Sequence, residues 1–202
     1  IKGGTRFIDD IELTFERLSD AETALASLER LLAEVELQLN AAKTRIVALP
    51  DKIESVYVSE LRRHPPAASD APASSWIDYF NRAFELASQH PQDGVLRYAT
   101  AALQGVTATT KAWPLAQSLL WQCIATDPGT LRFVVDVLLI NKHRAGLTPD
   151  TSLGTDAINA LIRSSALVGH GSEVVWSIWA AIVLGLTLTP ESQAAIASVD
   201  DS

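Results

Sequence analysis

The sequence predicts a protein in two parts, an α+β segment at the N-terminus and an all-α domain after it, so that the whole chain is predominantly α. Three observations support this fold class. Apolar and polar residues alternate near the start of the chain, a segment rich in proline, alanine and serine spans residues 65–75, and helical periodicity dominates residues 76–202.

A β-hairpin is predicted at the start of the chain. Residues 11–15 alternate, with Ile11, Leu13 and Phe15 on one side and polar residues on the other, which is the period of a half-buried strand. The adjacent acids Asp9 and Asp10 then fall at the bend. Aspartate is a common turn residue in its own right, but two carboxylates at one exposed bend also offer the oxygen ligands that Mg²⁺ prefers.

An amphipathic helix and a strand are predicted next. The helix begins with a capping box formed by Ser19 and Glu22 and runs to about Leu39, with leucines repeating at intervals of three and four. Asn40 ends it. Residues 43–49 are then predicted to form a strand that stops at Pro50.

The residues after Pro50 favour a second helix, with apolar side chains at helical spacing and basic residues at its end. The β-branched Val56 and Val58 leave a strand as the alternative. We place a domain boundary in the proline-rich segment. The predicted organisation is a first domain over residues 1–64, a linker over 65–75 and a helical-repeat domain over 76–202.

Periodic apolar segments separated by glycine and proline predict seven helices in the last domain. Pairs of helices recurring every 35–40 residues are typical of an α-solenoid of the HEAT kind. The five tryptophans lie among aliphatic residues at helical spacing, which indicates core positions more than base-stacking ones. The predicted helices cover residues 76–89, 95–104, 114–125, 131–144, 157–167, 174–186 and 191–199.

Composition and charge limit the partners and the cellular compartment that we expect for this protein. A net charge of −8 argues against a surface that coats nucleic acids generally. The single cysteine, Cys123, excludes an internal disulfide and suits the cytoplasm. The chain contains no methionine, even at position 1, so we expect it to belong to a longer polypeptide. The most apolar run, residues 174–188, is shorter than the roughly 20 residues of a membrane span, so we expect no membrane insertion.

Two short motifs link the first domain to a known family. Residues 6–10 read Arg-Phe-Ile-Asp-Asp, and residues 39–44, after the predicted helix, read Leu-Asn-Ala-Ala-Lys-Thr. This pair of motifs, at this separation, resembles the C-terminal part of a reverse-transcriptase palm, where a box of aromatic-x-Asp-Asp lies on a hairpin. The segment over residues 170–179 resembles the helical repeats of bacterial defence-associated and abortive-infection reverse transcriptases.

The resemblance implies nucleotidyl transfer with two Mg²⁺ ions. Asp9 would be the principal metal ligand, Asp10 the supporting acid, and a further aspartate would come from an upstream strand. Phe7 would lie beside the primer end, and Lys43 near the triphosphate, where it could act as a general acid. An ordinary solvated lysine is the alternative for Lys43. The expected substrates are dNTPs, added to DNA with an RNA template or with none.

A non-catalytic interpretation stays open beside the enzymatic one. Helical repeats commonly serve protein binding, and an acidic repeat domain of this size could act as an oligomerisation or partner-binding module without chemistry of its own. We expect a homo-oligomer under either interpretation.

Overall fold

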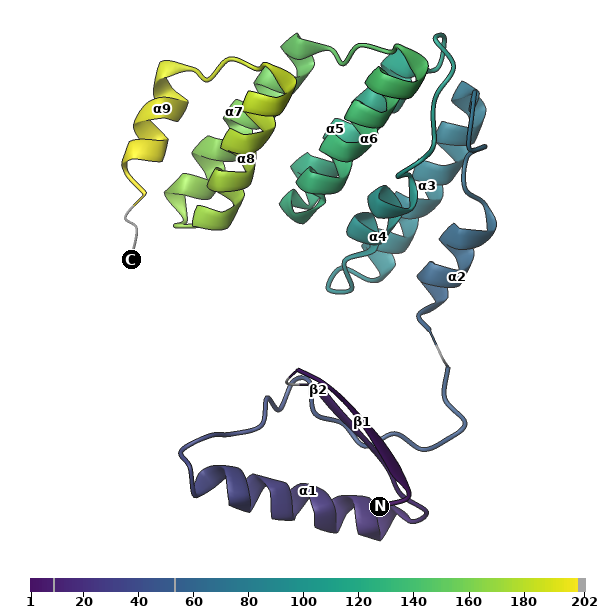
Figure 1. The fold of residues 1–202 in the computed structure, drawn as a ribbon, viewed down its shortest axis with the longest axis vertical. Helices are drawn as coiled ribbons and strands as arrows, with labels where there is room; N and C mark the ends of the chain where they lie inside the picture. Colours follow the sequence, from purple (N-terminus) through teal and green to yellow (C-terminus); the bar gives the residue numbers. More distant parts are fainter. Residues whose placement is uncertain (9, 53, 200–202) are drawn as a thin grey trace. The chain divides into compact units, whose positions relative to one another are not determined.

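The computed structural model describes residues 1–8, 10–52 and 54–199, which form two compact units over residues 1–53 and 54–202 (Figure 1). The described chain is predominantly helical, with one two-stranded antiparallel hairpin at its N-terminal end. These coarse features of the predicted fold class are confirmed. Each unit is described by itself below.

The first unit consists of the hairpin and one helix. Strands β1 (Gly3–Phe7) and β2 (Asp10–Thr14) pair in antiparallel register, from Gly3 opposite Thr14 to Phe7 opposite Asp10. Helix α1 (Leu18–Ala33) follows. Its N-cap is Arg17, with no side-chain cap, so the predicted capping box is wrong: Ser19 already lies inside the first turn. The helix also ends well before Leu39, and Glu36 then takes a positive φ of 58°.

The strand predicted over residues 43–49 is also wrong. The chain folds instead into a tight turn, in which the backbone N–H groups of Lys43 and Thr44 both donate to the carbonyl of Asn40, at 3.0 and 2.9 Å. Residues 45–49 continue without a partner strand. A strand depends on ladder hydrogen bonds to a neighbouring strand. Residues 43–49 have the apolar pattern of a strand, but no neighbouring strand pairs with them in the described first unit.

No described side chain of the first unit is buried. The predicted leucine stripe of α1 does face inward, since Leu25, Leu28 and Leu32 are half-buried, but Leu31 on the same helix is 56% exposed. On the hairpin, Ile11 is 56% and Leu13 is 41% exposed. A segment of this kind lacks the buried apolar area that normally offsets chain entropy.

The second unit is built from helices joined by loops in its described part, and it contains the hydrophobic core. Its first helix settles the alternative left open after Pro50 in favour of a helix. The elements are α2 (Val56–Arg63), α3 (Ala73–Gln89), α4 (Val95–Ala102), α5 (Trp113–Thr126), a 3₁₀ turn η1 (Pro128–Thr130), α6 (Leu131–Ala145), α7 (Thr151–Leu167), α8 (Gly171–Leu184) and α9 (Pro190–Ala197).

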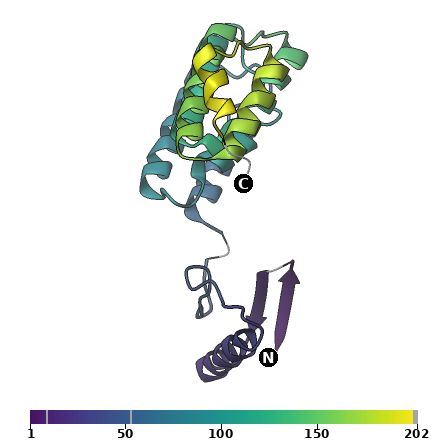
Figure 2. The same ribbon diagram turned by 90° about the vertical axis from the view of Figure 1, so that its left-hand side faces the viewer.

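These helices form two layers. Helices α3, α5, α7 and α9 pack in succession in one layer, and α4, α6 and α8 do so in the other, while α2 packs against α3 and α4 (Figure 1). Figure 2 views the same stack from the α9 end. On α2, Glu60 pairs with Arg82 of α3, and Tyr57 donates its hydroxyl to the carbonyl of Asp93 at 3.0 Å.

The first layer repeats at a regular interval. The N-cap residues of its helices are Pro72, Ala112, Asp150 and Thr189, which are 40, 38 and 39 residues apart. Each helix of this layer thus begins one repeat after the previous one, close to the predicted period of 35–40 residues. The identity of the repeats as HEAT-like stays a prediction.

Buried amide side chains fix these starting points. The amide oxygen of Gln117 on α5 accepts from the backbone N–H of Asp150 at 2.8 Å, and that of Asn159 on α7 accepts from the N–H of Thr189 at 2.8 Å. Asn141 on α6 holds the loop before α5 in the same manner, accepting from Ala108 at 2.8 Å. Each amide replaces the water that a loop N–H would otherwise need.

The proline-rich segment belongs to this second unit. Pro66 and Ala71 are buried, and Ala71 forms a β-bridge with Ala108 in the loop between α4 and α5. The N–H of Ala71 donates to the carbonyl of Thr107 at 2.9 Å, and the carbonyl of Ala71 accepts from the N–H of Thr109 at 3.1 Å. The two compact units therefore divide after residue 53, upstream of the linker expected from composition.

Three of the five tryptophans are core residues, since Trp76, Trp113 and Trp121 are at most 5% exposed. Trp176 on α8 is 43% exposed, and Trp179 is half-buried. None of the helices in the described ranges has both the length and the apolar character needed to cross a bilayer.

Gly154 should be intolerant of substitution, although it lies inside helix α7. A Cβ at this position would lie 2.9 Å from the buried ring of Trp121 and 3.1 Å from Leu186. We expect Gly154→Ala to lower the free energy of unfolding by up to about 2 kcal/mol, because overpacking costs about 1–3 kcal/mol and the higher helix propensity of alanine offsets about 1 kcal/mol of that cost. Urea unfolding measures the difference. Gly171→Ala is the control, because its nearest neighbour is 3.9 Å away; equal losses in both variants would contradict this packing argument.

Burial of Cys123 predicts a loss of stability at alkaline pH. Removal from water, helped by the nearby carboxylate of Asp127, raises the pKa of this thiol from 9.0 to about 12. Between these values only the unfolded chain releases the proton, so stability is full below about pH 9 and falls above it by up to about 1.4 kcal/mol per pH unit. Unfolding in urea between about pH 8 and pH 10 should show this slope, and Cys123→Ala should flatten it. An unchanged slope in the variant would assign the loss to other groups, such as Tyr79, whose pKa burial also raises.

Candidate functional site

The hairpin turns at the place in the chain where the acidic pair was predicted. Phe7 opposite Asp10 is the last residue pair of the ladder, so the connection contains only two residues, Ile8 and Asp9. Asp10 is the first residue of β2, and its side chain is exposed. Asp9 lies outside the described residues. The bend expected from the sequence is therefore present, with one of its two acids described.

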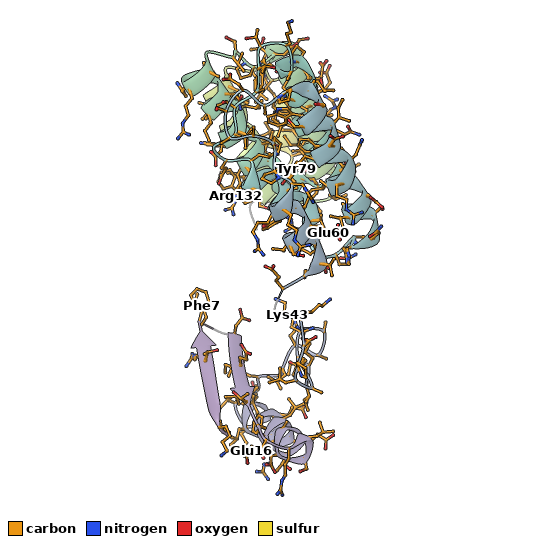
Figure 3. The ribbon with its side chains drawn as sticks, turned by 90° about the vertical axis from the view of Figure 1, so that its right-hand side faces the viewer. Phe7, Glu16, Lys43, Glu60, Tyr79 and Arg132 are labelled. Carbon is orange, nitrogen blue, oxygen red and sulfur yellow. The ribbon has the colours of Figure 1, made fainter. Side chains whose placement is uncertain are left out.

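Register places Phe7 and Asp10 on the same face of the hairpin. Cross-strand partners share a face, and faces alternate along each strand. Thr5 opposite Glu12 continues that face, whereas Ile11 lies on the other. Phe7 is 75% exposed at the end of β1, as Figure 3 shows. An aromatic ring and a carboxylate thus lie side by side on one face of an exposed bend.

The bend carries backbone strain. Ile8 has a φ of 58°, in the left-handed region that β-branched residues rarely occupy. Two-residue hairpin turns with positive φ ordinarily use asparagine or glycine. The Nε of Arg6 donates to the carbonyl of Ile8 at 2.8 Å and helps to hold this conformation. Strain of this kind costs about 1–3 kcal/mol and is concentrated at functional sites. The strained residue here is Ile8, next to Phe7, which favours a functional role for this bend.

Lys43 lies on a separate segment. It is exposed within the turn that follows α1, where Asn40 accepts from the backbone of residues 42–44. No hydrogen bond or ion pair between described residues joins Lys43 to Phe7 or Asp10. Phe7 and Lys43, both labelled in Figure 3, come from different elements of the first unit, β1 and the loop after α1. The described residues therefore do not bring Lys43 together with the hairpin tip.

The donor chemistry of the tip suits a hard cation, but the ligand set is incomplete. Carboxylate oxygens are the ligands that Mg²⁺ takes, and the exposed position of Asp10 would let the ion retain several waters. Among the described residues, however, there is no group of three or more His, Cys, Asp or Glu side chains that could hold a metal. A third carboxylate would have to come from another segment.

The second unit has two open surface pockets that the sequence did not single out. One, of about 340 Å³, includes Tyr57, Arg97 and Tyr98, with the two tyrosine rings in edge contact at 6.1 Å. The other, of about 240 Å³, includes Asp136, His143 and Arg144. Each pocket contains a polar side chain that is already paired: Arg97 pairs with Asp127 at 3.0 Å, and Asp136 accepts from Gln104 at 2.7 Å. Neither collects the residue types of a recognisable catalytic site.

Comparison of this chain with models of protein families, with curated proteins and with solved structures finds no match.

A weak metal site at the hairpin tip is the direct expectation from this geometry. Mn²⁺, which can replace Mg²⁺, should bind with a dissociation constant on the order of 1 mM, because two carboxylates alone form a poor ligand set. Paramagnetic broadening of the amide signals of Phe7, Asp10 and Ile11 reports the site. Asp9→Asn combined with Asp10→Asn should abolish the broadening, and Glu12→Gln, which removes a carboxylate from the same face, should leave it. Broadening only at other acidic residues would reject the site.

Proposed function

We propose that the N-terminal segment, residues 1–64, is part of the palm of a reverse transcriptase and that Asp9 and Asp10 hold Mg²⁺ for the transfer of nucleotides from dNTPs to a DNA strand. The observation that carries this proposal is the two-residue hairpin whose exposed tip reads Phe-Ile-Asp-Asp. The chain would act within a bacterial antiphage defence system, in the cytoplasm.

Three further features support the proposal. Ile8 is held in a conformation that is costly for its residue type, which is expected where function outweighs stability. Phe7 and Asp10 share one face of the hairpin, so an aromatic surface lies beside the acidic group. The apolar side chains of the hairpin and of α1 remain exposed, as suits elements that pack within a larger sheet.

Each residue would have a distinct part in the reaction. Bound Mg²⁺ would neutralise phosphate charge and favour the ionised primer hydroxyl. Asp9 and Asp10 would supply oxygen ligands, together with a carboxylate from another segment. Phe7 would pack against the primer end and orient it. Lys43 would contact the triphosphate and could give a proton to the leaving pyrophosphate, provided that its turn approaches the hairpin tip in the complex with substrate.

The helical unit supports the same family assignment through its architecture. Its two layers and its N-cap interval of 38–40 residues suit a HEAT-like solenoid. In this proposal the solenoid is the accessory domain that follows the palm.

A second candidate function is favoured by a separate observation. Large apolar side chains of the last repeat are exposed, among them Val175 and Ile182 at 65% and 75%. Exposed apolar surface of this kind commonly marks an interaction site. The helical unit would then act as an oligomerisation or protein-binding module, with or without polymerase activity in the same polypeptide.

The decisive experiment removes the acidic pair from the complete protein. Asp9→Asn with Asp10→Asn should lower Mg²⁺-dependent DNA synthesis from labelled dNTPs at least about 100-fold, because the charge that binds the metal is lost. The fold should be unaffected, since the side chain of Asp10 is exposed at the start of β2 and asparagine has nearly the same size as aspartate. Circular dichroism with thermal unfolding checks this.

Glu12→Gln is the matched control, because it removes an exposed carboxylate from the same face of β2. Synthesis within about threefold of the wild type is expected for this variant. If the double variant retains synthesis, or if Glu12→Gln abolishes it equally, the proposed role of the acidic pair is wrong.

A further inference from the structure

Arg97 is held in a fixed position at the surface pocket of about 340 Å³. Its Nε donates to Oδ2 of Asp127 at 3.0 Å, and Oδ1 of the same carboxylate accepts from the backbone N–H of Gly129 at 3.0 Å. One oxygen of Asp127 is therefore tied to the backbone and the other to the arginine. A carboxylate anchored in this way fixes the orientation of the guanidinium.

Two glycines leave room for the arginine side chain. A Cβ at Gly129 would lie 2.9 Å from Cδ of Arg97, and a Cβ at Gly94 would lie 3.3 Å from its Nε. Gly94 also has a positive φ of 66°, which favours glycine by itself, whereas Gly129 has no positive φ. The close approach of the Arg97 side chain is therefore what requires a glycine at position 129.

The guanidinium keeps most of its hydrogen-bonding capacity. Neither Nη1 nor Nη2 of Arg97 donates to a described residue, and 55% of the side chain is exposed. A guanidinium has five N–H donors in a planar fork, and Asp127 uses the one on Nε. The remaining N–H groups match the paired oxygens of a phosphate or carboxylate.

The pocket beside Arg97 has an aromatic wall. Tyr98, the next residue of α4, and Tyr57 of α2 both line it, and their ring centroids lie 6.1 Å apart in edge contact. Aromatic side chains provide surfaces on which nucleobases stack. A charged fork next to two aromatic rings suits a ligand with an oxyanion at one end and a flat ring at the other.

Two carboxylates near Arg97 limit the affinity of such a site. Asp127 offsets the charge of the arginine, and Asp93, which also lines the pocket, lies 3.4 Å from Nδ1 of His90. The fixed geometry of Arg97, more than a strong positive field, would then select the anion. The volume is near the lower end of the range for small-molecule sites. We expect a dissociation constant on the order of 1 mM.

We propose that this pocket binds a single nucleotide, with its phosphate on the Nη groups of Arg97 and its base against the rings of Tyr57 and Tyr98. A free nucleoside monophosphate and the 5′-phosphorylated end of a DNA strand share this chemistry. The net charge of −8 disfavours a longer nucleic-acid contact but is compatible with one nucleotide in a local site. The proposal concerns the helical unit and does not depend on the polymerase proposal.

The first test is a titration of the whole chain with deoxyadenosine monophosphate at low salt, followed by the amide NMR signals. The signals of Gly94, Tyr98 and Gly129 should shift together. Inorganic phosphate and deoxyadenosine should each bind at least about fivefold more weakly than the nucleotide, because each occupies only one end of the pocket. A 5′-phosphorylated trinucleotide distinguishes the two sources: binding at least as tight as that of the mononucleotide indicates a strand end, and weaker binding indicates a free nucleotide.

Asp127→Asn separates a fixed guanidinium from simple charge attraction. The substitution removes a negative charge beside Arg97, so a purely electrostatic site would bind the nucleotide more tightly. Asparagine has only one side-chain oxygen and cannot serve both Gly129 and Arg97, so the guanidinium loses its anchor. We expect binding to weaken at least about fivefold. Unchanged or tighter binding would overturn the proposal.

Gly129→Ala tests the same geometry without changing any charge. Its Cβ would occupy the space of the Arg97 side chain, so the nucleotide should again bind at least about fivefold more weakly. Thermal unfolding checks that both variants are folded. Wild-type affinity in a folded Gly129→Ala variant would contradict the proposed role of the arginine position.

Arg132→Lys is the matched control for Arg97→Lys. Arg132 is exposed and its guanidinium lies 4.3 Å from the ring of Phe133, but no carboxylate pairs with it among the described residues. Arg97→Lys should weaken binding at least about tenfold, because lysine has no planar fork, and Arg132→Lys should stay within about twofold of the wild type. Equal losses in both variants would mean general attraction of anions, and shifts confined to other signals would place the nucleotide elsewhere; either result overturns the proposal.

Discussion

The hydrogen bonds from buried amides to helix N-caps are the constraint on which the helical unit depends. A loop that enters a layered stack must satisfy its backbone N–H groups without water, and only a side chain with a fixed position in the core can do this reliably. Gln117 and Asn159 meet that need at Asp150 and Thr189, where α7 and α9 begin. Because each of these two amides belongs to the preceding helix of the same layer, the starts of α7 and α9 are fixed relative to that helix. The similar intervals of 38 and 39 residues between the N-caps of α5, α7 and α9 are consistent with this arrangement.

Most of the helical unit could be predicted from the sequence, because its signals are local and redundant. Apolar periodicity, glycine and proline agree along residues 76–199, and most observed helices begin and end within about three residues of the expected ones. The exception is α7, which begins at Thr151, six residues before the expected start. The predictions failed where a structure depends on contacts with segments that are distant in the sequence. Residues 43–49 have strand-like composition but no neighbouring strand, and residues 65–75 have linker composition but are held by the bridge between Ala71 and Ala108. The exposure of Trp176 also could not be predicted, since a buried tryptophan and an exposed one can have the same helical spacing.

The candidate site was predictable in its position but not in its completeness. The alternation of residues 11–15 and the two acids before them were sufficient to predict a hairpin bend at this point of the chain, although Asp10, which was expected at the bend, is the first residue of β2. The conformation of Ile8 had no signal in the sequence, because isoleucine is among the residues least suited to it. A set of metal ligands that comes from several segments likewise cannot be predicted from a short stretch of sequence. One exposed carboxylate at a bend defines where a cation could bind, whereas the chemistry depends on which other acids approach it.

The short helix α9 has a consequence for how the stack opens. Every interior repeat is stabilised from two sides, but α9 has eight residues and packs chiefly on α7. In an array of units linked only to their neighbours, a short helix with few packing partners has a small opening free energy. The hydrogen bond from the N–H of Thr189 to Asn159 joins α9 to the preceding helix of its layer. Among the helices of residues 54–199, α9 should therefore open before those that are packed on both sides.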